Sequence, residues 1–475
     1  MLARATALFA RFVATCVPSP FVFALLLTAV AFLLGLAIGR PDAQSLPARA
    51  ADLLSFWFGR DGSPGGFVAT GGFAFALQMC LVLATGHALA SAPPLARWLR
   101  RLAAWPRTEP RAAALTTLVA LLAAWLNWGF GLVAAAVFAR EVYRVARDRG
   151  ERWNYPLLCA AAYSSMMVWH GGLSGSAPLA VAQQSHEYQA IYGTISTART
   201  LFAPQNLALN GAFLVLLPCW FALLAARGRT SDRVLPAWPL PGDGAPLAER
   251  DPARALAASP AERLDESRAL GLGIVLLAGG SVALRIAQRG LAGSISLSSV
   301  IVAFLALGVL LHGTPRRYAA AFADAGGELS GILLQFPFYY GILGLLAESG
   351  VGRAFAESGT ALVRALAEWG LPLETAFSWV TFASAALLNC FVPSGGGQWA
   401  IQGGIAGQSA LDLGLDPARA VLAVAYGDEA TNMIQPFWAL ALLSITGIKA
   451  REVLTYSALL LAVSLPLYLL AAALF

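Results

Sequence analysis

Apolar runs long enough to cross a bilayer alternate with short charged segments along almost the whole chain. Residues 21–39 form the first run, which carries no charged residue. Further apolar runs lie at about 67–90, 207–225, 269–287, 296–311, 329–347 and 453–475. Because an α-helix of about 20 apolar residues spans the hydrocarbon core, the pattern predicts an all-α polytopic membrane protein. The first run lacks a convincing small-residue cleavage site, so we expect a retained helix rather than a signal peptide.

Two other apolar runs break near an asparagine. The segments LLAAWLNWGFG and AALLNCFVPSGGG carry Asn127 and Asn389, each followed by a glycine-containing stretch. Tyr163 and Tyr426 then follow 36 and 37 residues later, each ahead of a further polar interruption. Paired interruptions of this kind are typical of transporters that are built from two inverted repeats and bind their substrate where helices are discontinuous.

Arginines surround the first of these breaks, which lies in the run at residues 112–139. Five precede the run and five follow it: Arg97, Arg100, Arg101, Arg107, Arg111, Arg140, Arg144, Arg147, Arg149 and Arg152. Basic loops next to membrane helices stay on the cytoplasmic side, so both ends of this run are predicted to be cytoplasmic. The run is then a re-entrant hairpin with Asn127, Trp128 and Gly129 at its tip, since two half-helices of about 13 residues reach roughly 20 Å each.

The second break has acidic flanks instead. Glu368 and Glu374 precede the run at residues 375–409, and Asp412 and Asp416 follow it. The neighbouring loops lack a basic cluster of the kind that holds a loop in the cytoplasm. We therefore expect a second re-entrant hairpin that enters from the outside, so that the two hairpin tips point at each other.

The remaining runs complete an inverted arrangement. A broken span begins near Tyr155 with an interruption at about 170–178, and its counterpart covers about 419–446 with an interruption at 427–432. Residues 227–268 are rich in proline and charge, as a cytoplasmic linker would be. The predicted units are a first inverted repeat at 1–226, this linker, a connecting transmembrane helix at 269–289 and a second repeat at 290–475. They give about nine crossings plus two hairpins, with the N-terminus cytoplasmic and the C-terminus outside.

Composition excludes a soluble domain. Hydrophobic residues make up 58% of the 475 residues and charged residues only 12%, whereas soluble domains carry roughly a quarter charged residues. Basic cytoplasmic loops explain the net charge of +6, so no nucleic-acid partner is expected. The five cysteines are scattered without a CxxC spacing, which argues against disulfides and thiolate metal sites.

The second break combines small residues with polar side chains, in the order Ser394, Gly395, Gly396, Gly397 and Gln398. Non-helical backbone at membrane depth survives only where protein or a water-filled cavity satisfies it. Glycines let free N–H groups approach a ligand, and the positive end of the following helix favours a carboxylate. Carbonyl, Asn and Ser oxygens can instead cage Na⁺ near Asn127 and Asn389, or the glycines can serve only close helix packing.

Ionisable and hydroxyl side chains lie inside both broken spans. The first contains Ser164, Ser165 and His170, and the second contains Asp428, Glu429, Thr431 and Asn432. A charged group at the centre of a membrane helix costs roughly 3 kcal/mol even on the lower scales, and histidine titrates near neutral pH. We expect these residues to bind substrate or a coupling ion, with the alternative that they only satisfy buried partners. The role of Glu429 stays open.

Four segments resemble the AtoE-type short-chain fatty acid transporter family: LNWGFGLVAAAVFAREV, YSSMMVWHGGLSGSAPL, NCFVPSGGGQWAIQG and YGDEATNMIQPFWAL. They keep the order of the family's motifs, and PSGGGQWAIQG is a specific string rather than a compositional match. The resemblance implies uptake of small monocarboxylates such as butyrate or acetoacetate across a bacterial inner membrane, with the C-terminus in the periplasm. It also implies membership of the ion transporter superfamily, an elevator motion and a homodimer.

Residues and resemblance together predict a secondary active transporter coupled to H⁺ or Na⁺, with a small monocarboxylate and the lipid bilayer as its partners. An anion channel and a dicarboxylate transporter of the same superfamily are the alternatives. An intramembrane enzyme would have only Asp428 and His170 as a catalytic pair, and no nucleophile motif, metal-ligand spacing or phosphate-binding loop accompanies them. We therefore expect no enzymatic activity and no cofactor.

Overall fold

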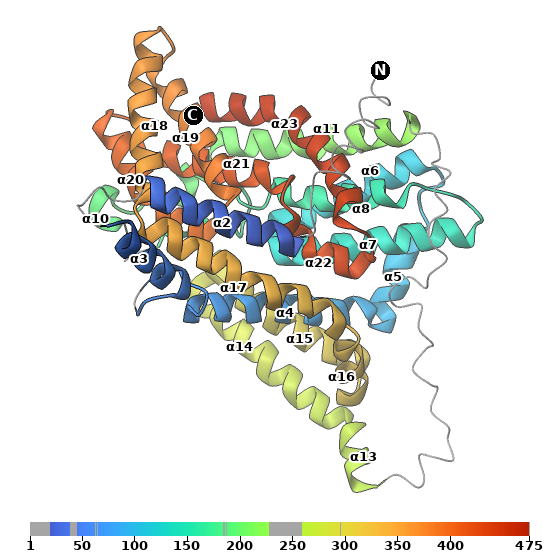
Figure 1. Ribbon diagram of the computed structural model, residues 1–475. Coiled ribbons are helices and arrows are strands. Elements are labelled where there is room, and N and C mark those ends of the chain that lie inside the picture. The colour runs from blue at the N-terminus through green and yellow to red at the C-terminus, as the bar shows by residue number, and fades with distance from the viewer. Residues whose placement is uncertain are drawn as a thin grey trace.

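A computed structural model of the chain describes residues 20–38, 45–61, 63, 65–183, 186, 188–227, 259–294 and 296–474. Every regular element in these ranges is a helix, and the long helices run roughly side by side (Figure 1). Seven of the described helices are long and apolar enough to cross a membrane: α2 (Pro20–Ile38), α4 (Thr70–Ser91), α6 (Glu109–Leu126), α11 (Pro204–Arg227), α14 (Arg268–Ser294), α17 (Gly326–Glu348) and α23 (Ala450–Ala473). The prediction of an all-α polytopic membrane protein is confirmed.

Several further helices connect or flank these spans. Two shorter apolar helices are α15 (Leu297–His312) and α22 (Pro436–Thr446). The helices outside the apolar runs are α3 (Leu46–Phe58), α5 (Pro93–Ala103), α16 (Pro315–Ala323) and α18 (Val351–Glu368), with the short elements α10 (Gln189–Tyr192), η2 (Thr197–Arg199) and α13 (Pro260–Asp265). Most of the predicted linker, residues 228–258, lies outside the described part of the chain, as do residues 1–19.

The first predicted hairpin is formed by α6 and α7 (Trp128–Asp148), which are joined by the single residue Asn127. The two open ends are tied together, because the backbone N–H of Asn154 donates to Oε1 of Glu109 at 2.8 Å. We call this unit hairpin 1. Its helices have 18 and 21 residues, longer than the predicted half-helices. The return helix continues past residue 139, where Glu141 pairs with both Arg140 and Arg144 and all three residues are buried.

The second predicted hairpin, which we call hairpin 2, consists of α19 (Leu373–Asn389) and α20 (Gly395–Asp412). The side chain of Gln398 reaches back to α19 and donates to the carbonyl of Ala385 at 2.9 Å. Near the open end, the Arg419 guanidinium donates to Oγ of Ser378 at 3.1 Å. Ser394 begins α20, since its hydroxyl accepts a hydrogen bond from the N–H of Gly397 at 3.2 Å.

Both broken spans are present, but the second break lies elsewhere than predicted. The first contains α8 (Tyr155–Tyr163), a 3₁₀ turn η1 (Ser164–Met167), a loop and α9 (Ser176–Val181), so its break runs from Ser164 and Ser165 into the predicted interruption at 170–178. In the second, α21 (Pro417–Asn432) continues through residues 427–432, and the prediction of a break there was wrong. The chain breaks at residues 433–435 instead. Pro436 lacks an N–H and forces the preceding residue into an extended conformation, which ends one helix and begins the next.

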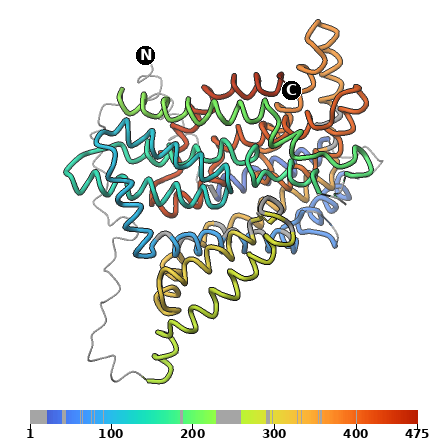
Figure 2. The backbone as a smooth tube through the Cα atoms, turned by 180° about the vertical axis from the view of Figure 1, so that it is seen from behind, coloured from blue at the N-terminus to red at the C-terminus, as the bar shows by residue number. Residues whose placement is uncertain are grey.

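The open ends of the two hairpins lie at opposite ends of the second broken span. The hydroxyl of Tyr155, which begins α8 just after hairpin 1, donates to the carbonyl of Thr446 at the end of α22. The start of α21 meets hairpin 2, as the Arg419–Ser378 bond shows. In Figures 1 and 2, α5 and the end of α7 accordingly lie far from α18 and α20. The placement of the hairpins in the bilayer and the division into two inverted repeats stay predictions.

Candidate functional site

The tip of hairpin 1 packs against the loop of the first broken span. The N–H of Leu173 donates to the carbonyl of Trp125 at 2.8 Å. The N–H of Trp128, at the start of α7, donates to Oγ of Ser174 at 2.9 Å. These two hydrogen bonds satisfy backbone groups that have no helical partner at the hairpin tip and in the loop. Non-helical backbone in a membrane interior requires such partners.

Asn127 caps the return helix of hairpin 1. Its Oδ1 accepts a hydrogen bond from the N–H of Phe130 at 3.0 Å. The Asn127 side chain is buried, and its Nδ2 has no hydrogen-bond partner. A buried amide of this kind retains unused donor capacity. One predicted site residue of hairpin 1 therefore has both a structural role and a donor available to a ligand.

The tip of hairpin 2 packs against the same broken span. A β-carbon built on Gly395 would lie 2.7 Å from Cη2 of Trp169, 2.9 Å from Cε1 of His170 and 3.2 Å from Oγ of Ser176. Only a residue without a side chain allows this approach. Gly396 is exposed, and a β-carbon there would meet nothing within 4 Å. The N-terminus of α20 thus touches His170 on one side and is open on another.

Three buried ionisable side chains form what we call the central cluster: His170, Asp428 and Glu429. Nδ1 of His170 lies 2.5 Å from Oδ2 of Asp428. Oε1 of Glu429 accepts hydrogen bonds from the backbone N–H groups of His170 at 2.7 Å and of Gly171 at 3.0 Å. Glu429 therefore satisfies the backbone at the first break, a role that the sequence left open.

The second ring nitrogen of His170 fixes the tautomer. The backbone N–H of Ala177 donates to Nε2 at 3.1 Å. Because a backbone N–H can only donate, Nε2 acts as an acceptor and carries no proton, and the ring proton lies on Nδ1 toward Asp428. His170 is neutral in this arrangement.

The charge of the central cluster is unbalanced. Asp428 and Glu429 are 0% and 1% exposed. Among the described residues, Asp428 forms an ion pair only with His170, and Glu429 forms none. Burying an ion without compensation costs several kcal/mol, so two ionised carboxylates beside a neutral imidazole require an added positive charge. The cluster is therefore suited to binding a cation, either a proton or a metal ion.

Asn389 joins hairpin 2 to the end of α21 and to the second break. Its Nδ2 lies 2.7 Å from the carbonyl of Asp428, 3.0 Å from Oγ1 of Thr431 and 2.9 Å from Oδ1 of Asn432. The carbonyl of Asn389 accepts from Nε2 of Gln435 at 2.5 Å. Oδ1 of Asn389 and Nδ2 of Asn432 are buried without partners. The predicted site residues Asn389, Asp428, Thr431 and Asn432 are therefore in direct contact.

Three tryptophans from different elements surround the meeting point of the breaks, and we call them the tryptophan cluster: Trp128, Trp169 and Trp438. Their ring centroids are 5.2 to 6.1 Å apart. Trp169 also stacks on the His170 ring at 4.4 Å. Nε1 of Trp169 and Nε1 of Trp438 are buried without partners. The cluster offers apolar faces and two unused donors in one place.

Ser164 and Ser165 lie on the 3₁₀ turn of the first break. The hydroxyl of Ser164 donates to the carbonyl of Ala161 at 2.6 Å, whereas Oγ of Ser165 is buried without a partner. The neighbouring Tyr163 hydroxyl lies 2.7 Å from the carbonyl of Asn432 and links the two breaks. These contacts place the first break against the second.

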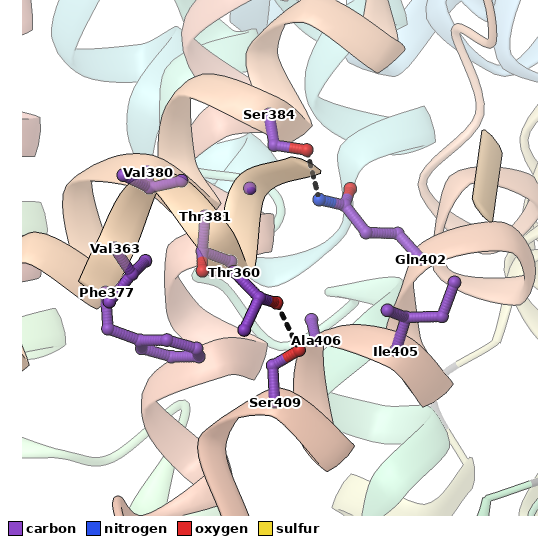
Figure 3. Close-up of a pocket in the computed structure, with 11 residues that line it drawn as sticks. Thr360, Val363, Phe377, Val380, Thr381, Ser384, Gln402, Ile405, Ala406 and Ser409 are labelled. Atoms are coloured by element: carbon purple, nitrogen blue, oxygen red, sulfur yellow. Dashed lines mark hydrogen bonds between the residues drawn. The ribbon is translucent and has the colours of Figure 1, made fainter. Parts of the chain in front are cut away.

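Gln398 belongs to the interior of hairpin 2 instead. Its side chain bonds to α19, and Gln402 continues the polar contacts with a hydrogen bond to Oγ of Ser384 at 3.1 Å. Figure 3 shows this bond and that between Thr360 and Ser409 around a crevice of about 20 Å³ between α18, α19 and α20. That volume is enough for a water molecule. Gln398 therefore supports the hairpin rather than the central cluster.

Among the described residues, no group of three or more His, Cys, Asp or Glu side chains is placed to hold a metal ion. Asn127 and Asn389 belong to different hairpin tips and share no hydrogen bond. A Na⁺ site near them therefore stays a prediction. The sequence did not indicate Ala177, Ser174 or Gln435, because each acts through its backbone or bonds to backbone.

Comparisons with known proteins cover the whole chain. A family model described as short chain fatty acid transporter matches residues 1–475. A protein of Escherichia coli K12 that bears the provisional name of short-chain fatty acid transporter is 36% identical over 456 residues, which are 96% of each chain. A Haemophilus influenzae protein with the same provisional name is 32% identical over 478 residues, 99% of each chain. Among solved structures, the YdaH transporter of Alcanivorax borkumensis is 15% identical with a TM-score of 0.44, covering 96% of this chain and 97% of that one.

Proposed function

This chain belongs to the short-chain fatty acid transporter family, and on that premise we propose that it is a secondary active transporter for small monocarboxylates such as butyrate and acetoacetate. The resemblance seen in four sequence segments is thereby confirmed, and the relatives are transporters rather than enzymes by name. The chain is an integral membrane protein. We further propose that it lies in a bacterial inner membrane with its N-terminus in the cytoplasm and its C-terminus in the periplasm.

One observation carries the proposal: both hairpin tips and both broken spans meet at buried polar groups. Gly395 of hairpin 2 touches His170, the Asn389 side chain bonds to the carbonyl of Asp428, and Trp128 of hairpin 1 contacts Trp438. Discontinuous helices that converge on buried ionisable groups are typical of transporter binding sites. A purely structural core would pair or exclude such groups.

The N-terminus of α20 is the proposed carboxylate site. Ser394 and the backbone N–H groups of Gly395, Gly396 and Gly397 lie at the positive end of an 18-residue helix. Asn127 adds an unused amide donor at the other tip. The tryptophan cluster is the proposed site of the acyl chain, since its faces are apolar and close to His170.

The proposed mechanism is an elevator motion in which hairpin 2 and α21 move the site between the two sides. Asp428 and His170 would hold the coupling ion, H⁺ or Na⁺, in the central cluster. No cofactor is required for this chemistry. A homodimer would give the moving part a fixed support. The lipid bilayer would cover exposed apolar helices such as α14, in which only 11% of the membrane-spanning segment is buried within the protein.

Counterflow tests this function without an imposed gradient. Proteoliposomes preloaded with unlabelled butyrate should take up labelled butyrate with saturation, and external acetoacetate should compete while a dicarboxylate should not. Protein-free vesicles give the contribution of diffusion. Competition by dicarboxylates alone would assign a different substrate class, and non-saturating flux would indicate a channel.

A further inference from the structure

Both ring nitrogens of His170 are held by groups on different elements. Nδ1 faces Asp428 of α21 at 2.5 Å, and Nε2 accepts the N–H of Ala177 in α9 at 3.1 Å. A proton that arrives at Nε2 turns this acceptor into a donor. The Ala177 bond then breaks, whereas the bond from Nδ1 to Asp428 is retained. Protonation of His170 is thus tied to a shift between α9 and the imidazole.

The groups that face His170 favour an added positive charge. The two carboxylates, Asp428 and Glu429, lie on α21. The neutral hydroxyl of Tyr426 in α21 donates to Asn206, and that of Tyr468 in α23 donates to the Met167 carbonyl. In the part of the chain that the structure describes, no arginine or lysine forms an ion pair with either carboxylate. A proton on His170 therefore reduces the net negative charge of a fully buried cluster.

A metal ion needs more oxygen ligands than the central cluster leaves free. Oε1 of Glu429 already accepts two backbone N–H groups, and Oδ2 of Asp428 faces the ring N–H. Oδ1 of Asp428 is buried without a partner, so a metal ion would find one free carboxylate oxygen here and would have to displace these donors to gain further ligands. A proton requires only the lone pair on Nε2 and the loss of one hydrogen bond. The geometry favours the proton.

Hairpin 2 connects this group to the substrate. The start of α20 lies against Cε1 of His170, as the close approach of Gly395 shows. A helix N-terminus carries a partial positive charge, so it repels an imidazolium at this distance. A carboxylate bound at the N-terminus offsets that repulsion. The two binding events therefore support each other.

We propose that the coupling ion is a proton, which Nε2 of His170 takes up from water when a monocarboxylate binds at the N-terminus of α20. This inference rests on the proposed function. One proton and one carboxylate together carry no net charge, so the transport step is electroneutral at this site. Because linkage is reciprocal, acid pH strengthens substrate binding by the same factor by which substrate strengthens proton binding.

Isothermal titration of the full-length protein in detergent with butyrate tests the proposal directly. Titrations at pH 7.5 in buffers of different ionisation enthalpy report the protons taken up on binding. We expect uptake approaching about one proton per butyrate, binding that is between about tenfold and about a hundredfold tighter at pH 6 than at pH 8, and no change when choline replaces Na⁺. Binding without proton uptake, or binding that requires Na⁺, would overturn the inference while supporting the proposed function. No binding of butyrate or acetoacetate would instead count against the proposed function.

Two variants separate titration from hydrogen bonding. His170→Gln can still accept the N–H of Ala177, and His170→Asn can still donate to Asp428, but neither titrates. Both should bind butyrate with no proton uptake and equal affinity at pH 6 and pH 8. His186→Gln is the matched control, since His186 bonds to the carbonyl of Gly193, away from the central cluster, and should keep the wild-type linkage. Wild-type proton uptake in either His170 variant would overturn the assignment, and the wild-type titration decides the issue even if a variant does not fold.

Discussion

Gly395 at the tip of hairpin 2 lies directly against His170 in the first broken span, although the two residues are 225 positions apart. A β-carbon on Gly395 would come within 2.9 Å of the imidazole and 2.7 Å of the Trp169 ring. Both rings are buried, at 0% and 1% exposure, so neither has free space to move into. The absence of a side chain at position 395 is what brings the hairpin tip and the central cluster together.

Gly395→Ala should therefore separate the hairpin tip from His170. We expect at least about a tenfold loss of butyrate counterflow, because a shift of about 1 Å at a binding site is enough to lose two orders of magnitude. Gly211→Ala is the matched control, since a β-carbon there meets nothing within 4 Å. Equal counterflow in the two variants would show that the contact is unimportant for transport.

Asn389→Ala should lower stability as well as transport. The substitution removes an amide that faces three buried acceptors in α21, and each acceptor left unsatisfied costs about 1–3 kcal/mol. The apparent melting temperature in detergent should fall by several degrees. Gln408→Ala, which removes an exposed amide from the same hairpin, should leave it unchanged. A melting temperature equal to that of the control would contradict the assigned role of Asn389.

Glu429 offers a test of whether an acceptor or a charge is required. Glu429→Gln keeps an oxygen that can accept from the N–H groups of His170 and Gly171, whereas Glu429→Ala leaves both unsatisfied. The Ala variant should lose about 2 kcal/mol or more of stability relative to the Gln variant. Thermal melts of both proteins measure the difference. Equal destabilisation would mean that the negative charge, not the acceptor, is the essential property.

The tryptophan cluster should set the chain length. Trp438→Ala opens space beside Trp169 and Trp128, and hexanoate has two more methylenes to bury than butyrate. At about 0.8 kcal/mol for each methylene, hexanoate should gain roughly tenfold relative to butyrate in competition assays. Trp369→Ala, at a position that is 83% exposed, should not change the ratio. An unchanged ratio in Trp438→Ala would place the acyl chain elsewhere.

Local chemistry made part of this fold predictable. Asn127 and Asn389 stand where apolar runs give way to glycine, and the structure ends or caps a helix at both residues. Pro436 also encodes the break at residues 433–435. The charged pair Asp428 and Glu429 instead suggested a break one helical turn too early, at residues 427–432. A buried charge indicates a constrained site, whereas proline determines where the helix stops.

Sequence patterns could not predict which residues of the site contact one another. Trp128 and Trp438 are 310 positions apart, and their contact depends on how two hairpins and two broken spans pack. The role of Glu429 likewise depends on backbone N–H groups of a loop 258 and 259 positions away. Periodicity and local motifs carry no information about such pairings.

The central claim is active transport of a small monocarboxylate. Its most direct test is the accumulation of labelled acetoacetate in proteoliposomes under an imposed Na⁺ gradient or an imposed pH gradient, in otherwise matched vesicles. Protein-free vesicles under the same gradients measure diffusion of the undissociated acid. The account predicts accumulation above both the equilibrium ratio and the protein-free level when the outside is acidic, and none under Na⁺ alone. Accumulation no greater than in protein-free vesicles under either gradient would contradict it.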